Sequence, residues 1–241
     1  MTNDALHPSL QLRMALPANE EYPKGVLPIP APIAGTAFFP GGHGLWMDKE
    51  VPFFPDGGIM ILGHDFHSKE EYEASRKRGE EDLNAPTWRN LRSLLETAEV
   101  PLQQCFFTNF FMGLRAGKET TGPFPGRKDP AFVQRCSEFF LYQLRIQRPR
   151  AVVVLGSEVP SLIAPLAPQL KPWRNARLGD IDRAGATRVE GVQFADGLPQ
   201  CTVVSLIHPS LRHANLRHRT KALGRDAHMV EVEMLKALHG H

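Results

Sequence analysis

Residues 59–68, IMILGHDFHS, join four apolar residues to a glycine and then to a polar run. The apolar residues predict a short buried strand, and Gly63 marks the turn at which the chain leaves it. Asp65 follows at the edge of the sheet where ligands of open parallel sheets bind, so it is a candidate catalytic residue. The alternative is that Asp65 caps the next helix, as an Asp after a strand often does.

Three further apolar segments alternate with helical patterns along the chain. The predicted strands are residues 59–62, 104–108, 151–155 and 202–207. Strands that alternate with helices indicate a parallel sheet covered by helices on both faces, which also explains why the strands are apolar throughout. We therefore predict an α/β fold, a three-layer sandwich with a four-stranded parallel sheet flanked by helices.

Four helices are predicted between and after these strands. The first has Thr87 as its N-cap and an apolar face from Trp88 to Ala98. The second is opened by the Asp-Pro pair at 129–130, where proline suits the first helical position. A third is predicted to begin near Ser157 and a fourth to run from about 221 to 238.

The chain divides at about residue 58. Residues 1–57 are rich in proline and glycine, which predicts an irregular extension packed on the core and anchored by Phe38, Phe39 and Trp46. This extension is also a candidate wall of the site. Residues 58–241 form the predicted α/β domain, in which 169–200 are interpreted as a long connection, with room for a short hairpin.

The composition narrows the class of protein. The chain has 241 residues and a net charge of +2, which does not by itself indicate a nucleic-acid partner. It has no run of 18 apolar residues, so we expect no membrane span, and we expect no secretory signal. Three widely spaced cysteines suit a reducing compartment. We expect a cytoplasmic monomer.

Polar or glycine residues follow each of the four predicted strands. They are, in chain order, Asp65, Asn109, the pair Gly156 and Ser157, and His208. Because the carboxyl ends of parallel strands meet at one edge, these residues are expected to line a single cleft. This convergence is the strongest functional signal in the sequence, since each residue alone is common in turns.

A basic run follows His208. Residues 212–225 contain no acidic residue, and such a cluster beside a cleft suits a phosphate backbone. The alternative is an ordinary solvated basic face. The basic residues are Arg212, Arg217, Arg219, Lys221 and Arg225, with His213 and His218 between them.

The ordered set of motifs resembles the uracil-DNA glycosylase superfamily over roughly residues 58–220. Residues 63–67, Gly-His-Asp-Phe-His, resemble the Gly-Gln-Asp-Pro-Tyr motif that activates water in its best-known branch. Residues 108–109 resemble the Thr-Asn motif of bacterial branches, and 154–157 resemble the glycine turn after the third strand. Residues 208–211, His-Pro-Ser-Leu, resemble the His-Pro-Ser motif and its intercalating loop.

The resemblance implies a DNA glycosylase and assigns roles to individual residues. Asp65 would stabilise the oxocarbenium-like sugar and position or deprotonate water, His208 would donate a hydrogen bond to the departing base, and Asn109 would match the edge of uracil. The implied base pocket contains Gly63, His64, Phe66 and His67. The implied DNA contacts are Gly156, Ser157, Ser210, Leu211, Arg212, His213 and Arg217.

The sequence departs from the family pattern at positions that bear on which base is the substrate and on whether an iron–sulfur cluster is bound. Phe66 and His67 stand where the family has Pro-Tyr, so uracil or another modified pyrimidine is the expected substrate. Gly113 stands where some bacterial branches have an iron–sulfur cysteine. We therefore predict a divergent bacterial-type member without iron–sulfur cysteines, with no metal and no cofactor. No lysine occupies a motif position, which indicates that water is the nucleophile.

Two other functions remain open from the sequence. A metal-dependent hydrolase could use His64, Asp65, His67 and His208 as ligands. A non-catalytic module that binds DNA or nucleotides would keep the glycosylase fold and the basic run.

Overall fold

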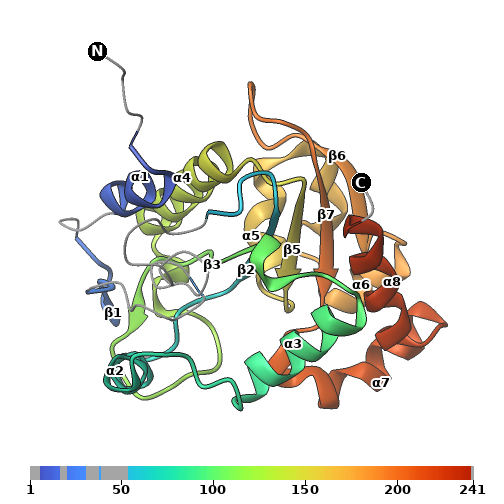
Figure 1. Cartoon of the computed structure of the whole chain (residues 1–241), viewed down its shortest axis with the longest axis horizontal. Helices are drawn as coiled ribbons and strands as arrows, with labels where there is room; N and C mark the ends of the chain where they lie inside the picture. The colour runs from blue at the N-terminus through green and yellow to red at the C-terminus, as the bar shows by residue number, and fades with distance from the viewer. Residues whose placement is uncertain (1–5, 17–20, 31–37, 39–53, 240–241) are drawn as a thin grey trace.

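The structure is a computed structural model that describes residues 6–16, 21–30, 38 and 54–239 (Figure 1). Its central sheet has five strands in the order β3-β2-β5-β7-β6, of which the first four run parallel. The parallel strands are β2 (Ile59–Gly63), β3 (Cys105–Asn109), β5 (Ala151–Leu155) and β7 (Cys201–Leu206). All four predicted strands are thereby confirmed.

The fifth strand, β6 (Arg188–Val192), pairs antiparallel with β7 at the edge of the sheet. It lies inside the segment that the sequence predicts as a long connection. Most of its residues are partly or fully exposed, so it lacks the continuous apolar run of the buried strands. An edge strand with one solvated face leaves a much weaker signal in the sequence.

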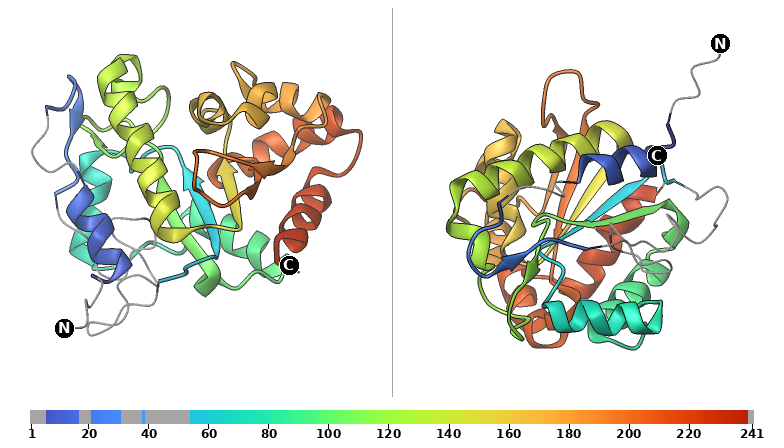
Figure 2. Two further views of the ribbon diagram at one scale, coloured as in Figure 1. Left: turned by 90° about the horizontal axis from the view of Figure 1, so that it is seen from above. Right: turned by 90° about the vertical axis from the view of Figure 1, so that its left-hand side faces the viewer.

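Helices cover both faces of the sheet, as predicted. Met60 and Leu62 of β2 face one apolar cluster, while Ile59 and Ile61 face another. The first cluster includes side chains from α1 (Pro8–Ala15), α4 (Pro130–Gln147) and α5 (Val159–Ile163). The second includes side chains from α3 (Pro86–Thr97) and α8 (Ala227–His239). Figures 1 and 2 show the sheet between these two layers.

The remaining elements surround this sandwich. The charged stretch after residue 68 forms α2 (Lys69–Arg78), and α6 (Leu178–Arg183) precedes the edge strand. The N-terminal segment contributes α1, which lies against α4, and β1 (Val26–Leu27), which pairs antiparallel with β4 (Leu114–Arg115). Short 3₁₀ turns at 102–104, 125–128, 164–166, 168–173 and 209–211 complete the described elements.

Two helix boundaries differ from the predictions. Thr87 is not the N-cap of α3, because the helix begins one residue earlier at Pro86 and has no side-chain cap. The predicted helix from 221 to 238 covers α8 and only the last three residues of α7 (Arg212–Leu223), most of which was not predicted. Gly224 separates them with φ +67°, a left-handed conformation that ends a helix readily only at glycine.

One anchor of the N-terminal extension reaches the sheet. The ring of Phe38 lies edge-on to Trp88 and Phe107, with centroids 5.4 and 5.6 Å away. Phe39 and Trp46 lie outside the described residues. Among the described helices, none has the length and apolar character that a membrane crossing requires.

The Asp-Pro start of α4 is confirmed and can be tested directly. Asp129 is the N-cap, and its Oδ1 accepts a hydrogen bond from the backbone N–H of Phe132 at 2.9 Å. We expect Asp129→Ala to lower the free energy of unfolding by about 1 kcal/mol in urea titrations. Asp129→Asn keeps the accepting oxygen and serves as the control. Equal stability of the Ala variant and the wild type would contradict the capping role.

Candidate active site

The four strand ends meet at one edge of the sheet, and two glycines make the close contacts possible. A Cβ at Gly63 would lie 2.2 Å from Oδ1 of Asn109, the residue paired with it in β3. A Cβ at Gly156 would lie 3.1 Å from Cβ of His208, and Gly156 has φ +87°. Both positions therefore require glycine so that Asn109 and His208 can lie against neighbouring strand ends.

Asp65 is held by a buried network at the end of β2. Its Oδ2 accepts hydrogen bonds from Nδ1 of His64 and Nη2 of Arg115, each at 2.8 Å. Its Oδ1 accepts from Nε of Arg115 at 3.2 Å and from the backbone N–H of His67 at 3.0 Å. The Asp65 and Arg115 side chains are only 7% and 5% exposed, so this two-point ion pair is shielded from solvent.

The helix-cap alternative for Asp65 is wrong. Ser68 is the N-cap of α2, and its Oγ accepts a hydrogen bond from the backbone N–H of Glu71 at 3.3 Å. The contact from Asp65 to the His67 N–H instead closes a turn in which His67 has φ +68°. This conformation is uncommon for a residue with a side chain, and Asp65 helps to hold it.

Arg115 was missed by sequence reasoning. Besides its two bonds to Asp65, its guanidinium donates to the backbone carbonyls of Thr121, Gly122 and Pro123 at 2.8–3.2 Å. It therefore ties a connecting loop to the candidate catalytic carboxylate. Arg115 lies 50 residues from Asp65 in the chain and belongs to no motif, so no local pattern indicates the pairing.

The network determines the charge of Asp65. Burial by itself would raise the pKa of Asp65, but the hydrogen bonds from His64 and Arg115 and the electrostatic interaction with both side chains outweigh it and hold this pKa well below its usual range. The carboxylate is therefore ionised at every pH at which the protein would be assayed. It is also a weak proton acceptor, because both of its oxygens already accept hydrogen bonds.

His208 lies within electrostatic range of this network. Burial, followed by the nearby His67 and His64, lowers the pKa of His208 to about 4, while Asp65 acts in the opposite direction. Its Nδ1 accepts from the backbone N–H of Ser210 at 3.3 Å. The neutral ring therefore carries its proton on Nε2, the nitrogen that can donate to a ligand.

Not all of the residues predicted to form the base pocket are accessible to a base. Phe66, which the resemblance assigns to the base pocket, is buried in the apolar cluster that includes α4, so its ring is not exposed to stack on a base. His64 lies edge-on to the ring of Phe111, with centroids 5.2 Å apart. Phe38 is better placed as a wall, because its Cε1 would lie 3.5 Å from a Cβ at Gly63.

The turn after His208 presents an apolar side chain to solvent. Leu211 is 53% exposed, and Ser210 beside it is also exposed. The side chain of Asn90 in α3 donates a hydrogen bond to the carbonyl of Pro209 at 2.8 Å and so fixes the backbone of the turn. Ser157 is exposed in the neighbouring turn after β5.

The basic run does not form one exposed surface, which corrects the prediction for Arg212. Arg212 is buried and forms an ion pair with Glu231 of α8, and Arg219 is buried between Glu231 and Asp182. These carboxylates come from other helices, so the absence of acids within 212–225 was misleading. Arg225 pairs with the exposed Glu233. Arg217, Lys221, His213 and His218 remain exposed on α7.

The described residues of the site do not fit a metal ion or an iron–sulfur cluster. In the part of the chain that the structure describes, no three His, Cys, Asp or Glu side chains are grouped to hold a metal. A side chain at 113 would collide with β1, because a Cβ there would lie 2.5 Å from Cγ1 of Val26. Burial raises the pKa of Cys105 and Cys201 to about 12, which disfavours the thiolate needed for ligation.

The fold and this sheet-edge site define an α/β protein with an Asp, an Asn and a His at the carboxyl ends of three parallel strands of one sheet. A family model, the uracil DNA glycosylase superfamily, matches residues 55–231, which is more than half of the chain. The chain belongs to that superfamily, and its membership supports a function of the DNA glycosylase type. No curated protein matches the chain.

The Asp65–Arg115 pair predicts a defined dependence of stability on pH. Because the folded-state pKa of Asp65 is depressed, the pair stabilises the protein fully above the unfolded value of about 3.9 and loses this effect as the pH falls. We expect Asp65→Asn to cost about 3 kcal/mol at pH 7, since Arg115 stays buried without its partner charge. In urea titrations the difference should persist at pH 5 and shrink below pH 4.

Asp56→Asn is the matched control, because Asp56 forms an exposed ion pair with Arg148. It should change stability little at any pH. A cost for Asp65→Asn that stays constant down to pH 2 would contradict the lowered pKa of Asp65 in the folded protein.

Proposed function

We propose that this protein is a monofunctional DNA glycosylase. It flips uracil or another modified pyrimidine out of DNA and hydrolyses the N-glycosidic bond to leave an abasic site. The observation that carries the proposal is the meeting of Asp65 and His208 at one sheet edge, where Asp65 lies close enough to raise the pKa of His208 against the effect of burial. Membership of the superfamily supports the same class of reaction.

The two residues have complementary tasks in this reaction. The bond between the sugar and the base breaks with positive charge on the sugar and negative charge on the base. Asp65, which stays ionised, stabilises the sugar cation and orients the attacking water. His208 stays neutral at pH 7 and donates its Nε2 proton in a hydrogen bond to the base oxygen, where negative charge grows.

Asn109 supplies recognition of the base. Its amide offers one donor and one acceptor, which match the O4 and N3–H edge of uracil. Within the described residues its amide forms no hydrogen bond, and it lies directly over Gly63. His64 and His67 lie within electrostatic range of His208, and the ring of Phe38 lies beside Gly63, as Asn109 does.

The proposed DNA surface consists of the two turns and the exposed side of α7. Ser157 is exposed and offers its backbone N–H and hydroxyl to a phosphate, whereas the N–H of Gly156 already donates to the carbonyl of Leu206 at 2.9 Å. Leu211 is exposed where it can fill the gap left by a flipped base. Ser210, His213 and Arg217 flank it, whereas Arg212 is omitted because Glu231 already holds it. We propose that the protein acts on DNA as a cytoplasmic monomer.

One observation favours a second candidate function, a glycosylase fold that binds DNA or nucleotides without cutting. Asp65 is 7% exposed, and Arg115 and His64 bind its oxygens, which leaves little of the carboxylate to meet a substrate. The metal-dependent hydrolase has no such support, because a cation beside Asp65 would be repelled by Arg115.

The test is incubation of the protein with DNA that carries uracil, hypoxanthine, alkylated bases or modified cytosines, followed by detection of abasic sites. We expect release of one base class by the wild type and a loss of about 100-fold or more in His208→Ala and Asp65→Asn, since each removes charge stabilisation in the transition state. DNA binding should survive in both variants. Binding without any abasic product, over the whole panel, would favour the second candidate.

The DNA surface predicts a change in salt dependence. We expect Arg217→Ala combined with Lys221→Ala to weaken binding to all sequences and to lower the slope of log affinity against log salt by about 2. Lys236→Ala is the control, because Lys236 lies on α8 and pairs with Glu99. The measurement is fluorescence anisotropy over a salt series, and an unchanged slope in the double variant would refute this surface.

A further inference from the structure

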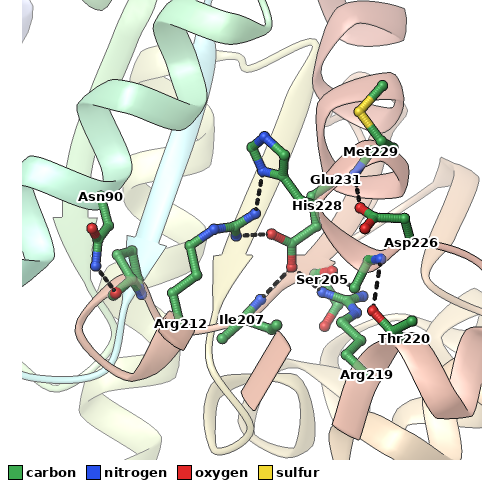
Figure 3. A network of polar contacts seen from close by, with 12 residues as sticks. Asn90, Ser205, Ile207, Arg212, Arg219, Thr220, Asp226, His228, Met229 and Glu231 are labelled. Carbon is green, nitrogen blue, oxygen red and sulfur yellow. Dashed lines mark hydrogen bonds and ion pairs between the residues drawn. The ribbon is translucent and has the colours of Figure 1, made fainter. Parts of the chain in front are cut away.

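A buried carboxylate that the proposed reaction does not use lies beside the His208 turn. Glu231 of α8 is fully buried, and its Oε1 accepts a hydrogen bond from the backbone N–H of Ile207 at 2.8 Å. The same carboxylate pairs with Arg212 through Oε2 and with Arg219 through Oε1. Figure 3 shows Glu231 between the two arginines, with the Ile207 N–H directed at it.

The network balances its charges and joins four elements. Arg219 also donates to Oδ1 of Asp182 at 3.0 Å and to the carbonyl of Ser205 at 2.8 Å. Two buried arginines therefore face two buried carboxylates from α6 and α8, while β7 contributes backbone groups. Buried ion pairs contribute little net stability, because removing the charges from water is costly. The network is therefore more informative for the backbone segment that it holds in place.

The network holds both ends of the short segment 208–211. Ile207 directly precedes His208, and Arg212 directly follows Leu211. The two oxygens of Glu231 thus bind the residues on either side of segment 208–211. Asn90 of α3 holds the middle of the segment through the carbonyl of Pro209. The segment carries both the proposed hydrogen-bond donor and the exposed Leu211.

We propose that Glu231 and Asn90 are positioning residues that hold the segment 208–211 so that the His208 imidazole is directed at the departing base. The inference rests on the proposed function and adds to it the parts of the fold that act on His208 from α8 and α3. Neither residue touches the reacting atoms. Glu231 and Asn90 act by fixing the backbone on either side of His208.

The first test measures His208 without any activity. Its pKa of about 4 arises from burial and from His67 and His64, with Asp65 opposing, and all of these depend on where the imidazole lies. NMR titration of the imidazole carbons should show the His208 pKa rising toward 6.5, the ordinary histidine value, in Asn90→Ala and in Glu231→Gln. Asn84→Ala and Glu233→Gln are matched controls, exposed residues before α3 and on α8, and should leave it unchanged.

The second test uses the base-release reaction. We expect Asn90→Ala to lower the single-turnover rate of base release by about tenfold to a hundredfold, because a small displacement of a catalytic group causes a loss of this size. The affinity for DNA should change little. In a His208→Ala background the same substitution should have almost no further effect. A substitution that merely loosens the fold would lower the rate in both backgrounds.

The two tests separate failure of this inference from failure of the proposed function. An unchanged His208 titration in folded Asn90→Ala overturns the inference whether or not the protein releases a base. A shifted titration in a protein that releases no base supports the inference and counts against the glycosylase. If Glu231→Gln does not fold because the buried Arg212 loses its partner charge and Arg219 loses one of its two, Asn90→Ala still decides the outcome.

Discussion

The ion pair between Arg115 and Asp65 is the contact on which the arrangement of the site depends. It joins the end of β2 to the segment that follows β3, and through three backbone carbonyls it also binds the loop at 121–123. A carboxylate buried to this degree would otherwise tend to bind a proton. Because Arg115 supplies the opposing charge, Asp65 remains an anion beside the proposed sugar site, and its orientation is fixed from two sides.

A second buried carboxylate, Glu231, fixes the position of the turn that carries His208. Glu231 binds the backbone before His208 and the side chain of Arg212 after it, so the turn is held before any substrate arrives. The site thus combines an anion that cannot readily take a proton with a histidine that stays neutral, because burial lowers its pKa to about 4. Fixed charges and dipoles of this kind favour stabilisation of charge that develops during a reaction.

Much of the fold could be predicted, because its signals are local. Continuous apolar runs predicted the four parallel strands, and the Asp-Pro pair predicted the start of α4. The edge strand β6 was anticipated only as room for a short hairpin within 169–200, because one of its faces is solvated. The break at Gly224 was not predicted. In the site, the order of strand ends predicted that Asn109 and His208 lie at one sheet edge, and the structure adds that they lie against Gly63 and Gly156.

The amino-acid sequence by itself determined that an Asp, an Asn and a His follow three parallel strands, since strand ends are visible in periodicity and turn residues. The partners of those residues came only from tertiary structure. Arg115 reaches Asp65 across 50 residues, and Glu231 reaches Arg212 across 19, which removes that arginine from the expected DNA surface. Ion pairs between distant elements depend on how helices and loops pack on the sheet, and no local pattern of residues encodes that packing.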